Sequence, residues 1–468
     1  MYKISVNSIK GVIKGEILVD NFAGEISEFC QDTRVAVYGS AFFAINGDAF
    51  DGHDYLDVAI RKGCKLLIID NEQKISNLSS DDISDISIIL VKSTTVALQT
   101  LAKFYLSQLD AKKIAITGSV GKTTTRDIVA QVCASMYNTE SNISNFNSVV
   151  GVPLTILGFA KNIEIAILEM GMDKLGEIAC MTDIVNPDIS IITNVGTSHI
   201  ERLGSRENIF IAKMEIAKNL SDDGLLIIFK DDYLNKQKIK AYISENRELF
   251  KSEHFEIIEV GFDEDCDYQI KNYMSCGASG SSFEVVRGCE TREFNISLNG
   301  KHNVQNATLA IAMADVINID NQKVDKVLQR LTITGKRLSI INTPKYTVID
   351  DTYNASPQSM KAGLDVLAEF RDKRKVAILG DMYELGSESE MFHADVCEYA
   401  KRKADYVISV GEISKAMKSD LHFNAKEELI DNLDKLIREK DVIFVKASRG
   451  MKLEHVVDAI KKKSEKNG

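Results

Sequence analysis

A glycine-rich loop at residues 117–125 carries the residue types that bind nucleotide phosphates. The loop reads TGSVGKTTT, follows the apolar run KKIAI and precedes RDIVAQVCASM, whose apolar spacing is helical. Glycines let a backbone wrap a phosphate, and amide groups at a helix start point toward it. Lys122 would then reach the β- and γ-phosphates, and the Thr123 hydroxyl would bind Mg²⁺. The predicted phosphate-binding residues are Gly118, Ser119, Val120, Gly121, Lys122, Thr123 and Thr124.

This phosphate loop (residues 117–125) is shorter than the full nucleotide-binding pattern. That pattern has a further glycine six residues before the lysine, where this chain has Ile116. A glycine turn before a helix is the alternative interpretation. The strand and helix patterns on its two sides favour a phosphate site.

Polar residues also follow the ends of other predicted strands. Glu169 ends IEIAILE, His199 comes after DISIIT, Asp351 follows KYTVID, and Asp381 follows KVAILG. In open α/β sheets, ligands bind beyond the carboxyl ends of the strands, so these residues are candidates for one site. Glu169 and His199 are ligands that a magnesium–phosphate site could use. A hydrogen-bonded loop histidine is an equally good interpretation of His199.

The spacing of three further residues leaves their roles open. Lys213 lies in a helical pattern, FIAKMEIAKNL, where a lysine is normally a solvated surface cation. Asn303 and Asn306 stand one turn apart at the start of a predicted helix. They could contact a base or ribose, or they could cap the helix.

The elements that must position these residues alternate between strands and amphipathic helices. This alternation predicts the α/β class with largely parallel sheets. The 468 residues predict about three domains at ~150 residues each, with boundaries that give 1–110, 111–334 and 335–468. Between about residues 261 and 300 the pattern alternates polar with apolar and is rich in glycine, which predicts antiparallel hairpins.

Composition excludes several classes of function. The formal net charge of −11 argues against broad nucleic-acid binding but not against a nucleotide in a local pocket. No apolar run approaches the ~20 residues of a membrane span, and the first residues lack the apolar segment of a signal peptide. None of the eight cysteines forms a CxxC pair. We therefore expect a cytoplasmic protein with reduced thiols rather than a disulfide or zinc framework.

Five motifs in this order resemble the ATP-dependent Mur ligases of bacterial peptidoglycan synthesis. They are TGSVGKTT, ILEMG, ITNVGTSHIERLGS, GKHNVQNATLAIA and DDTYNASPQSM, and they span nearly the whole chain. The resemblance implies a central P-loop ATPase domain with a parallel sheet. An N-terminal UDP-binding α/β domain and a C-terminal Rossmann-like domain would flank it. The N-terminal stretch DTRVAVYGSAFFAINGDAFDGHD is similar to the uridine-nucleotide domain of two members.

Within the family, four stretches favour the member that joins D-alanyl-D-alanine to UDP-N-acetylmuramoyl-tripeptide. They are NFNSVVGVPLTIL, EMGMDKLGEI, DDTYNASPQSM and LGDMYELGSES, the last followed by His393. The Asn-Pro-Arg motif of the ligase that adds diaminopimelate as the third residue does not occur. Two stretches depart from the usual pattern: Asn147-Ser148-Val149-Val150 before GVPL, and DDTYNASP in place of DDSYNANP.

Three other functions stay open. A ligase for the third residue and a folylpolyglutamate synthetase-like ligase would use the same chemistry, although the uridine-type domain argues against the second. A P-loop NTPase switch or binding module would hydrolyse ATP without forming a bond.

The resemblance also implies roles for individual residues. Lys122 would bind the γ-phosphate of ATP, Thr123 and Glu169 would hold one Mg²⁺, and His199 a second. Lys213 aligns with a lysine that several members carry as a carbamate, which could face a metal. The catalytic residues would be Lys122, Glu169, His199 and Lys213, and ATP would also contact Asn303, Asn306, Arg337 and Asp351.

The two other substrates are expected at residues outside the phosphate loop. Those that would bind the UDP substrate are Asp32, Thr33, Arg34, Asn46, Gly47, Asp51, His53, Asn145 and Asn147. Those on the D-alanyl-D-alanine side would be Tyr353, Asn354, Asp381, Glu384, Ser448 and Arg449. The expected protein is a monomer that binds no nucleic acid and activates a carboxylate through an acyl phosphate.

Overall fold

The structure is a computed structural model that describes residues 3–47, 50–143, 145–335 and 337–465. The chain divides into two compact units. The first comprises Met1–Ala115, Tyr137–Met172 and Gly176–Asp188, and the second comprises Ile116–Met136, Asp173–Leu175 and Ile189–Gly468. The domain boundaries after residues 110 and 334 stay a prediction. Among the described residues, no helix combines the length and apolar character that crossing a membrane requires.

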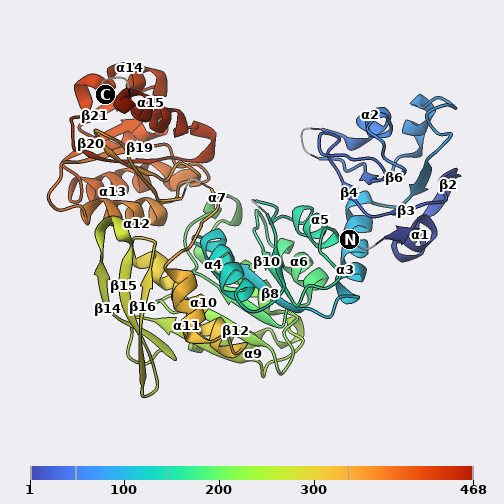
Figure 1. The fold of residues 1–468 in the computed structure, drawn as a ribbon, viewed down its shortest axis with the longest axis horizontal. Coiled ribbons are helices and arrows are strands. Elements are labelled where there is room, and N and C mark those ends of the chain that lie inside the picture. Colours follow the sequence, from blue (N-terminus) through green and yellow to red (C-terminus); the bar gives the residue numbers. More distant parts are fainter. Residues whose placement is uncertain (1–2, 48–49, 144, 336, 466–468) are drawn as a thin grey trace. The chain divides into compact units, whose positions relative to one another are not determined.

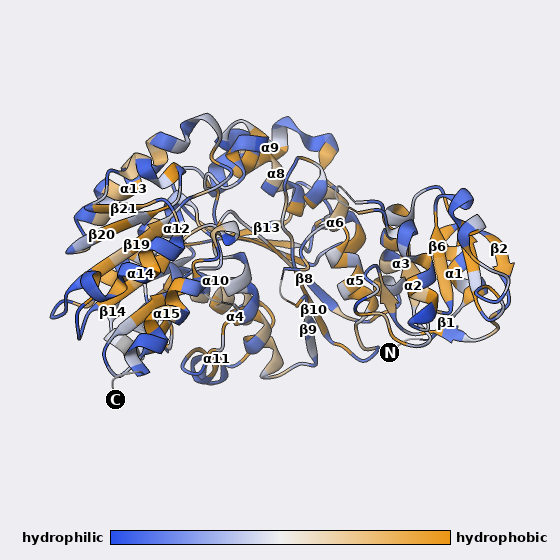
Figure 2. Cartoon of the chain, turned by 90° about the horizontal axis from the view of Figure 1, so that it is seen from above, coloured by the Kyte–Doolittle hydropathy of each residue, from blue (hydrophilic) through white to orange (hydrophobic). Residues whose placement is uncertain are grey.

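The first unit is built on a five-stranded sheet (Figure 1). Its elements are β1 (Ile4–Ser5), α1 (Val6–Ile13), β2 (Glu16–Asp20), β3 (Glu25–Ile26), β4 (Phe29–Cys30), β5 (Ala41–Phe43), α2 (Leu56–Arg61), β6 (Leu66–Ile69), β7 (Ser87–Leu90), α3 (Thr94–Ser107), β9 (Thr139–Ser141), α5 (Gly151–Leu157), β10 (Ile165–Glu169) and α6 (Glu177–Val185). The sheet order is β2-β7-β6-β5-β4, with β4 to β7 parallel and β2 antiparallel. The central β6 is apolar along its length and fully buried, as expected for a parallel strand covered on both faces (Figure 2).

Strand β8 (Lys112–Thr117) crosses the division between the units and leads into the phosphate loop. The remaining central elements are α4 (Lys122–Ala134), β11 (Ile189–Ile192), α7 (Ile200–Leu203), α8 (Arg206–Met214), β12 (Leu225–Phe229), α9 (Lys236–Glu245), β13 (Glu256–Gly261), β14 (Tyr268–Ser275), β15 (Ser281–Arg287), β16 (Glu290–Ile296), α10 (Lys301–Val316) and α11 (Asn321–Leu328). Strands β11 to β14 are parallel, and β14, β15 and β16 pair antiparallel, which confirms the predicted hairpins.

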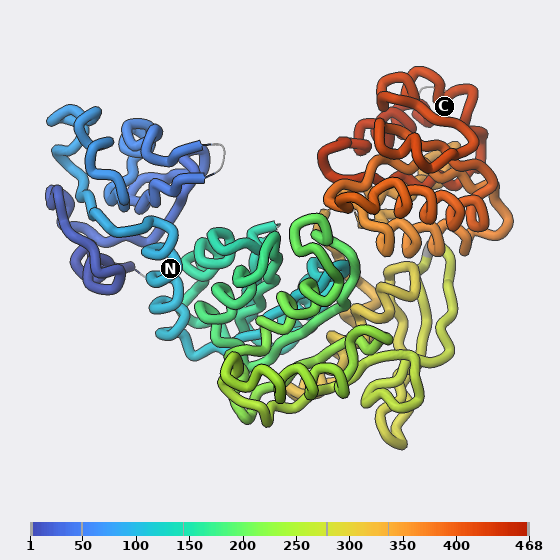
Figure 3. Tube along the Cα trace, turned by 180° about the vertical axis from the view of Figure 1, so that it is seen from behind, coloured from blue at the N-terminus to red at the C-terminus, as the bar shows by residue number. Residues whose placement is uncertain are grey.

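The chain beyond the central elements forms a six-stranded sheet with its own helices, at the orange-to-red end of the tube in Figure 3. Its elements are β17 (Ser339–Asn342), β18 (Thr347–Asp350), α12 (Pro357–Ala368), β19 (Lys375–Gly380), α13 (Ser389–Lys401), β20 (Tyr406–Val410), β21 (Leu421–Phe423), α14 (Lys426–Leu436), β22 (Val442–Lys446) and α15 (Glu454–Glu465). The sheet order is β17-β18-β22-β19-β20-β21, and every pair except β17 with β18 is parallel.

Alternating side chains of this sheet enter two apolar cores. Val348 and Ile378 pack on one face, and Ile349 and Ala377 on the other, as the period of two along a strand requires. Helix α12 begins at a capping box between Ser356 and Ser359, with Pro357 in the first helical position. The SPQS segment of the DDTYNASPQSM motif thus fixes where α12 starts.

All eight cysteines are free thiols. Cys30, Cys64, Cys133 and Cys397 are buried, whereas Cys276 and Cys289 are exposed.

Candidate active site

The phosphate loop has the predicted strand–loop–helix context. It lies between the end of β8 at Thr117 and the start of α4 at Lys122. Gly121 has a φ of 87°, and a Cβ there would lie 2.7 Å from Oδ1 of Asn306. A Cβ on Gly118 would lie 1.8 Å from Oγ1 of Thr193. Both positions therefore require glycine, because a side chain would collide with the neighbouring loop or helix.

Residues that follow β11 hold the loop in place. Asn194 accepts a hydrogen bond from the Val120 amide through Oδ1 at 3.0 Å and donates to the Val120 carbonyl through Nδ2 at 2.8 Å. Thr193 Oγ1 donates to the same carbonyl at 2.6 Å, and the Gly196 amide donates to Ser119 Oγ at 2.9 Å. The sequence analysis gave Asn194 no role. Its function in the fold is to satisfy both backbone groups of Val120.

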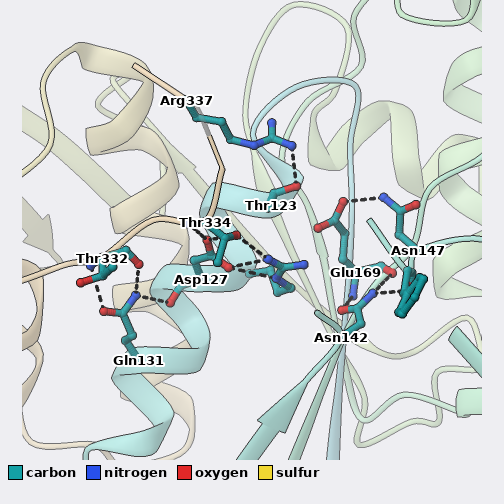
Figure 4. Close-up of polar contacts among 11 residues, drawn as sticks. Thr123, Asp127, Gln131, Asn142, Asn147, Glu169, Thr332, Thr334 and Arg337 are labelled. Carbon is teal, nitrogen blue, oxygen red and sulfur yellow. Dashed lines mark hydrogen bonds and ion pairs between the residues drawn. The ribbon is translucent and has the colours of Figure 1, made fainter. Parts of the chain in front are cut away.

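Three of the residues predicted to bind ATP meet at the start of α4. Nζ of Lys122 donates to the Gly118 carbonyl at 2.7 Å. The buried Thr123 hydroxyl accepts a hydrogen bond from Nη2 of Arg337 at 3.0 Å (Figure 4). The Arg337 guanidinium also lies 4.1 Å from the centre of the Tyr353 ring. A cation from outside the central elements therefore reaches the hydroxyl predicted to bind Mg²⁺.

The linker (residues 332–338, of which 336 lies outside the described residues) is tied to α4 by side chains that sequence reasoning missed. Oδ2 of Asp127 accepts hydrogen bonds from both the amide and the hydroxyl of Thr334, each at 2.7 Å (Figure 4). Arg126 pairs with the other oxygen of Asp127 at 2.6 Å. Gln131 exchanges two hydrogen bonds with the backbone of Thr332. The contacts of Thr332 and Thr334 with α4 become visible only in the structure, because about 200 residues separate them from Gln131 and Asp127.

The two asparagines at the start of α10 have different surroundings. Asn306 is buried with its side chain against Gly121 of the phosphate loop. Asn303 is also buried, and its Nδ2 donates to the Asn299 carbonyl at 2.7 Å. The structure therefore brings Asn306 to the phosphate loop, whereas the Asn303 amide bonds back to the residue before the helix.

Asp351 is buried in an ion pair with Lys446. Nζ of Lys446 lies 2.5 Å from Oδ2 of Asp351 and donates to the Asn354 carbonyl at 2.7 Å. The other carboxylate oxygen of Asp351 accepts a hydrogen bond from the Leu338 amide at 3.2 Å. Burial raises the pKa of Asp351 and lowers the pKa of Lys446, and their mutual attraction opposes both shifts. Sequence reasoning missed Lys446.

His302 lies beside this ion pair. A Cβ on Gly300 would lie 2.7 Å from both the His302 ring and Val366, so the ring is packed at the start of α10. Burial, with the nearby positive charge of Lys446, lowers the pKa of His302 from 6.5 to about 4. A neutral imidazole here adds no second positive charge next to Lys446.

The depressed pKa of His302 predicts a pH dependence of stability. The unfolded chain binds a proton at His302 near pH 6.5 and the folded chain only near pH 4, so the free energy of unfolding falls as pH drops through this range. At pH 5, we expect the protonation of His302 in the unfolded chain to lower the free energy of unfolding by at most about 2 kcal/mol. His302→Asn should reduce the fall in thermal midpoint between pH 7.5 and pH 5, and the exposed His254→Asn should leave it unchanged. An equal fall in the His302 variant would contradict the prediction.

His199 stands among acidic residues at the start of α7, with a φ of 64°. Its Nδ1 lies 2.8 Å from Oε2 of Glu384 and 3.4 Å from Oδ1 of Asp173, although neither contact has hydrogen-bond geometry. The His199 ring lowers the pKa of Glu384. Arg202 holds Asp173 at 2.7 Å. Two residues predicted for different subsites, the metal and the dipeptide, thus lie next to each other.

Lys213 is 2% exposed, so the expectation of a solvated surface cation is wrong. Within the described residues, its ammonium has no ion pair and no side-chain hydrogen bond. Glu207, an acidic residue on the same helix, bonds to Tyr233 and Lys238. Burial, and next the charge of Lys122, lowers the pKa of Lys213 well below its usual value.

Glu169 lies in the first unit, at the end of β10, and is 1% exposed. Nδ2 of Asn147 donates to its Oε1 at 2.7 Å (Figure 4). Asn142 exchanges two hydrogen bonds of 2.9 Å with the Glu169 backbone. Asn147, predicted to contact the UDP substrate, therefore orients the carboxylate of Glu169. Asn145, which was also predicted to bind the UDP substrate, is exposed.

The residues predicted to bind the uridine nucleotide lie in two loops of the first unit. Asp32 accepts the Arg34 guanidinium through both oxygens, which lowers the pKa of Asp32, and Arg34 is largely exposed. Thr33 lies in the turn between them.

In the second loop, His53 is buried rather than open to a ligand. Its Nε2 accepts a hydrogen bond from the Asp70 amide at 3.2 Å, so Nδ1 carries the proton and donates to Asp51 at 2.7 Å. Asn46, next to the exposed Gly47, forms a bridge with Asp51. Residues 48 and 49 lie outside the described residues. The His53 ring thus holds the loop that presents Asn46 and Gly47.

The residues predicted on the dipeptide side differ in how accessible they are. Asp381 and Ser448 are buried: the Ser414 amide donates to Asp381 at 2.7 Å, and the Tyr383 amide donates to Ser448 Oγ at 2.9 Å. Asn354 and Arg449 are exposed. The Tyr353 ring has Arg337 within 4.1 Å and Arg449 within 5.7 Å.

Each unit contains one of the residues predicted to bind Mg²⁺: the carboxylate of Glu169 is buried in the first unit, and the hydroxyl-bearing Thr123 is buried in the second. Both offer oxygen, the donor atom that Mg²⁺ prefers. Three or more His, Cys, Asp or Glu side chains arranged to hold a metal ion are not found among the described residues. Mg²⁺ usually binds through one or two protein groups together with substrate phosphates, so it does not require such a cluster.

Comparison with known proteins gives matches over the whole chain. The model of the Mur ligase middle domain matches residues 116–314, and that of the Mur ligase glutamate ligase domain matches residues 336–449. The UDP-N-acetylmuramoyl-tripeptide–D-alanyl-D-alanine ligase of Bacillus subtilis (strain 168) is 35% identical over 98% of both chains. A crystal structure of MurF from Acinetobacter baumannii has a TM-score of 0.88 at 28% identity, covering 99% of both chains. A MurF ligase from Thermotoga maritima in complex with ADP has a TM-score of 0.82 at 26% identity, covering 94% of this chain and 98% of that one.

Proposed function

We infer the function of this chain from the premise that it belongs to the Mur ligase family. We propose that it is the ATP-dependent ligase that joins D-alanyl-D-alanine to UDP-N-acetylmuramoyl-tripeptide in peptidoglycan precursor synthesis. The observation that carries this proposal is the 35% identity over 98% of both chains to a ligase of that name. The phosphate loop, with Lys122 and Thr123 at the start of α4, supports the use of ATP. The similarity to the Thermotoga maritima MurF ligase in complex with ADP also supports the use of ATP.

The proposed reaction forms one amide in two steps. The terminal carboxylate of the tripeptide attacks the γ-phosphate of ATP, giving an acyl phosphate and ADP. The amine of D-alanyl-D-alanine then attacks the acyl carbon, and phosphate leaves. ATP is required because a free carboxylate is a poor acyl donor. Lys122 and Arg337 are the cations proposed to stabilise charge on the transferred phosphoryl group.

Mg²⁺ is proposed as the cofactor, with Thr123, Glu169, His199 and a modified Lys213 as the residues that would hold it. When bound, it would neutralise charge on the phosphate oxygens. Asn147 orients the Glu169 carboxylate, and Arg337 donates a hydrogen bond to the Thr123 hydroxyl oxygen.

The binding sites for the other two substrates are proposals too. We propose that the UDP portion binds at the loops around Arg34 and Asn46, and that the dipeptide binds near Tyr353 and Arg449. The exposed side chain of Arg34 and the exposed Asn46 support the first site. We propose that the protein acts in the cytoplasm, where ATP is available, and as a monomer.

A substrate panel would test the proposal against the alternatives. Purified protein is incubated with ATP, Mg²⁺ and one acceptor pair at a time, and the product is identified by mass spectrometry while ADP release is followed. We expect ligation only with UDP-N-acetylmuramoyl-tripeptide plus D-alanyl-D-alanine. Ligation of a single amino acid to a dipeptide precursor or a folate would favour another ligase. ADP release that is independent of any acceptor would favour an NTPase switch.

A further inference from the structure

The buried ion pair between Lys446 and Asp351 joins three segments of the second unit. Lys446 ends β22 and is 2% exposed. Besides its contact with Oδ2 of Asp351 at 2.5 Å, its Nζ donates to the Asn354 carbonyl at 2.7 Å. One ammonium group therefore fixes both ends of the turn at residues 351–354.

The carboxylate of Asp351 carries this connection to the linker. Its Oδ1 accepts a hydrogen bond from the Leu338 amide, while its Oδ2 accepts one from Nζ of Lys446. The residue is only 7% exposed. Both oxygens of Asp351 thus have a partner within the protein.

The linker is consequently held on both sides of Arg337. Asp127 on α4 binds Thr334, and Asp351 binds Leu338. Between these two attachments, Arg337 reaches Thr123 at 3.0 Å and lies over the Tyr353 ring. The position of the Arg337 guanidinium therefore depends on where the Leu338 amide is held.

We propose that Lys446 is a positioning residue, whose ion pair with Asp351 holds Leu338 so that Arg337 reaches Thr123 of the phosphate loop. The consequence for turnover rests on the proposed function, whereas the consequence for the linker does not. Removal of one member of a buried ion pair leaves an uncompensated charge, so Lys446→Met should release Asp351 from its present place. The double variant Asp351→Asn, Lys446→Met removes both charges. It keeps a side-chain oxygen that can accept a hydrogen bond from the Leu338 amide.

The chain offers a matched control near the opposite end of β22. There Arg374 pairs at 2.8 Å with the buried Asp441, which directly precedes β22. The other contacts of the Arg374 side chain are the Leu436 carbonyl and the Tyr406 ring. Arg374→Met also breaks a buried ion pair of the same sheet. It should lower the thermal midpoint without affecting the linker.

The first measurement is amide hydrogen exchange of the full chain, read on the peptide that contains Leu338. We expect faster exchange in Lys446→Met than in the wild type and in Arg374→Met, and protection largely restored in the double variant. Wild-type exchange in Lys446→Met would overturn the proposal whatever the activity. If Lys446→Met does not fold, the double variant takes its place. Loss of Leu338 protection there, with the acceptor oxygen present, would overturn the proposal as well.

The second measurement is steady-state ligation. Misplacement of Arg337 should lower kcat on the order of 10- to 100-fold in Lys446→Met, with a smaller change in KM for ATP. In an Arg337→Ala background, Lys446→Met should have little further effect, because its action passes through Arg337. Fully additive effects would overturn this route. Absence of ligation by the wild type would refute the proposed function and leave the exchange result as the test of the ion pair.

Discussion

Replacement of Lys122 by alanine is expected to abolish ligation while the chain stays folded. The lysine stands at the first residue of α4, where its Nζ is directed over the loop carbonyl of Gly118. In the proposed reaction this cation acts mainly on the charge that develops on the transferred phosphoryl group. We therefore expect kcat to fall by roughly 10²–10³-fold, the typical effect of removing one preorganised electrostatic group. The measurement is kcat and KM for ATP with saturating acceptors.

The control for Lys122→Ala is Lys112→Ala, at the opposite end of the strand that leads into the phosphate loop. Lys112 is exposed at the start of β8, so its replacement should leave turnover unchanged. Thermal midpoints of both variants separate loss of chemistry from loss of fold. Near-normal kcat together with near-normal KM in Lys122→Ala would show that Lys122 does not serve the reaction. A rise in KM alone would show that the lysine contributes only to ground-state binding.

The local features of the site could be predicted from the sequence because they depend on near neighbours. The strand, the glycines and the helix around Lys122 are contiguous, and the structure confirms that context. The hairpins between residues 261 and 300 follow from alternation and glycine content, and they are confirmed too. In each case a period of 2 or 3.6 residues carries the information.

Features that depend on distant pairing could not be predicted in this way. Lys446 is one lysine in the strand-end sequence VIFVKA, and its partner Asp351 lies 95 residues earlier. The sequence did not show that Asp51 and the Asp70 amide hold the buried His53 ring. It also did not show that Asn147 donates to the carboxylate of Glu169. Residue type and spacing identify polar groups near a site but not which of them support the others.

Lys213 shows the same limit, and its burial makes the strongest prediction about modification. A helical lysine was expected in solvent, whereas this amine is buried with its pKa lowered by desolvation and by Lys122. A lowered pKa favours the neutral amine, which is the form that reacts with CO₂ to give a carbamate and a proton. The carbamate would replace a buried cation by an anion, next to residues proposed to hold Mg²⁺.

If Lys213 is carbamylated, Lys213→Ala and Lys213→Met should both lose activity, by roughly 10²-fold or more. The methionine variant is the matched control for packing, because it fills the buried space without a charge. Lys213→Glu, or acetate added to the alanine variant, should restore part of the activity, since each returns a carboxylate to the site. Depletion of bicarbonate should reduce wild-type turnover, and bicarbonate should restore it.

The opposite result has an equally definite meaning. If Lys213 only fills space in the core, Lys213→Met should turn over normally, and bicarbonate should have no effect. Partial loss in Lys213→Met without rescue by Lys213→Glu or by acetate would indicate that the ammonium itself is needed. Mass spectrometry of the intact protein under CO₂, with the methionine variant as reference, reads the modification directly. Activity lost in Lys213→Met and regained with a carboxylate would establish that the buried amine carries a negative group in the working enzyme.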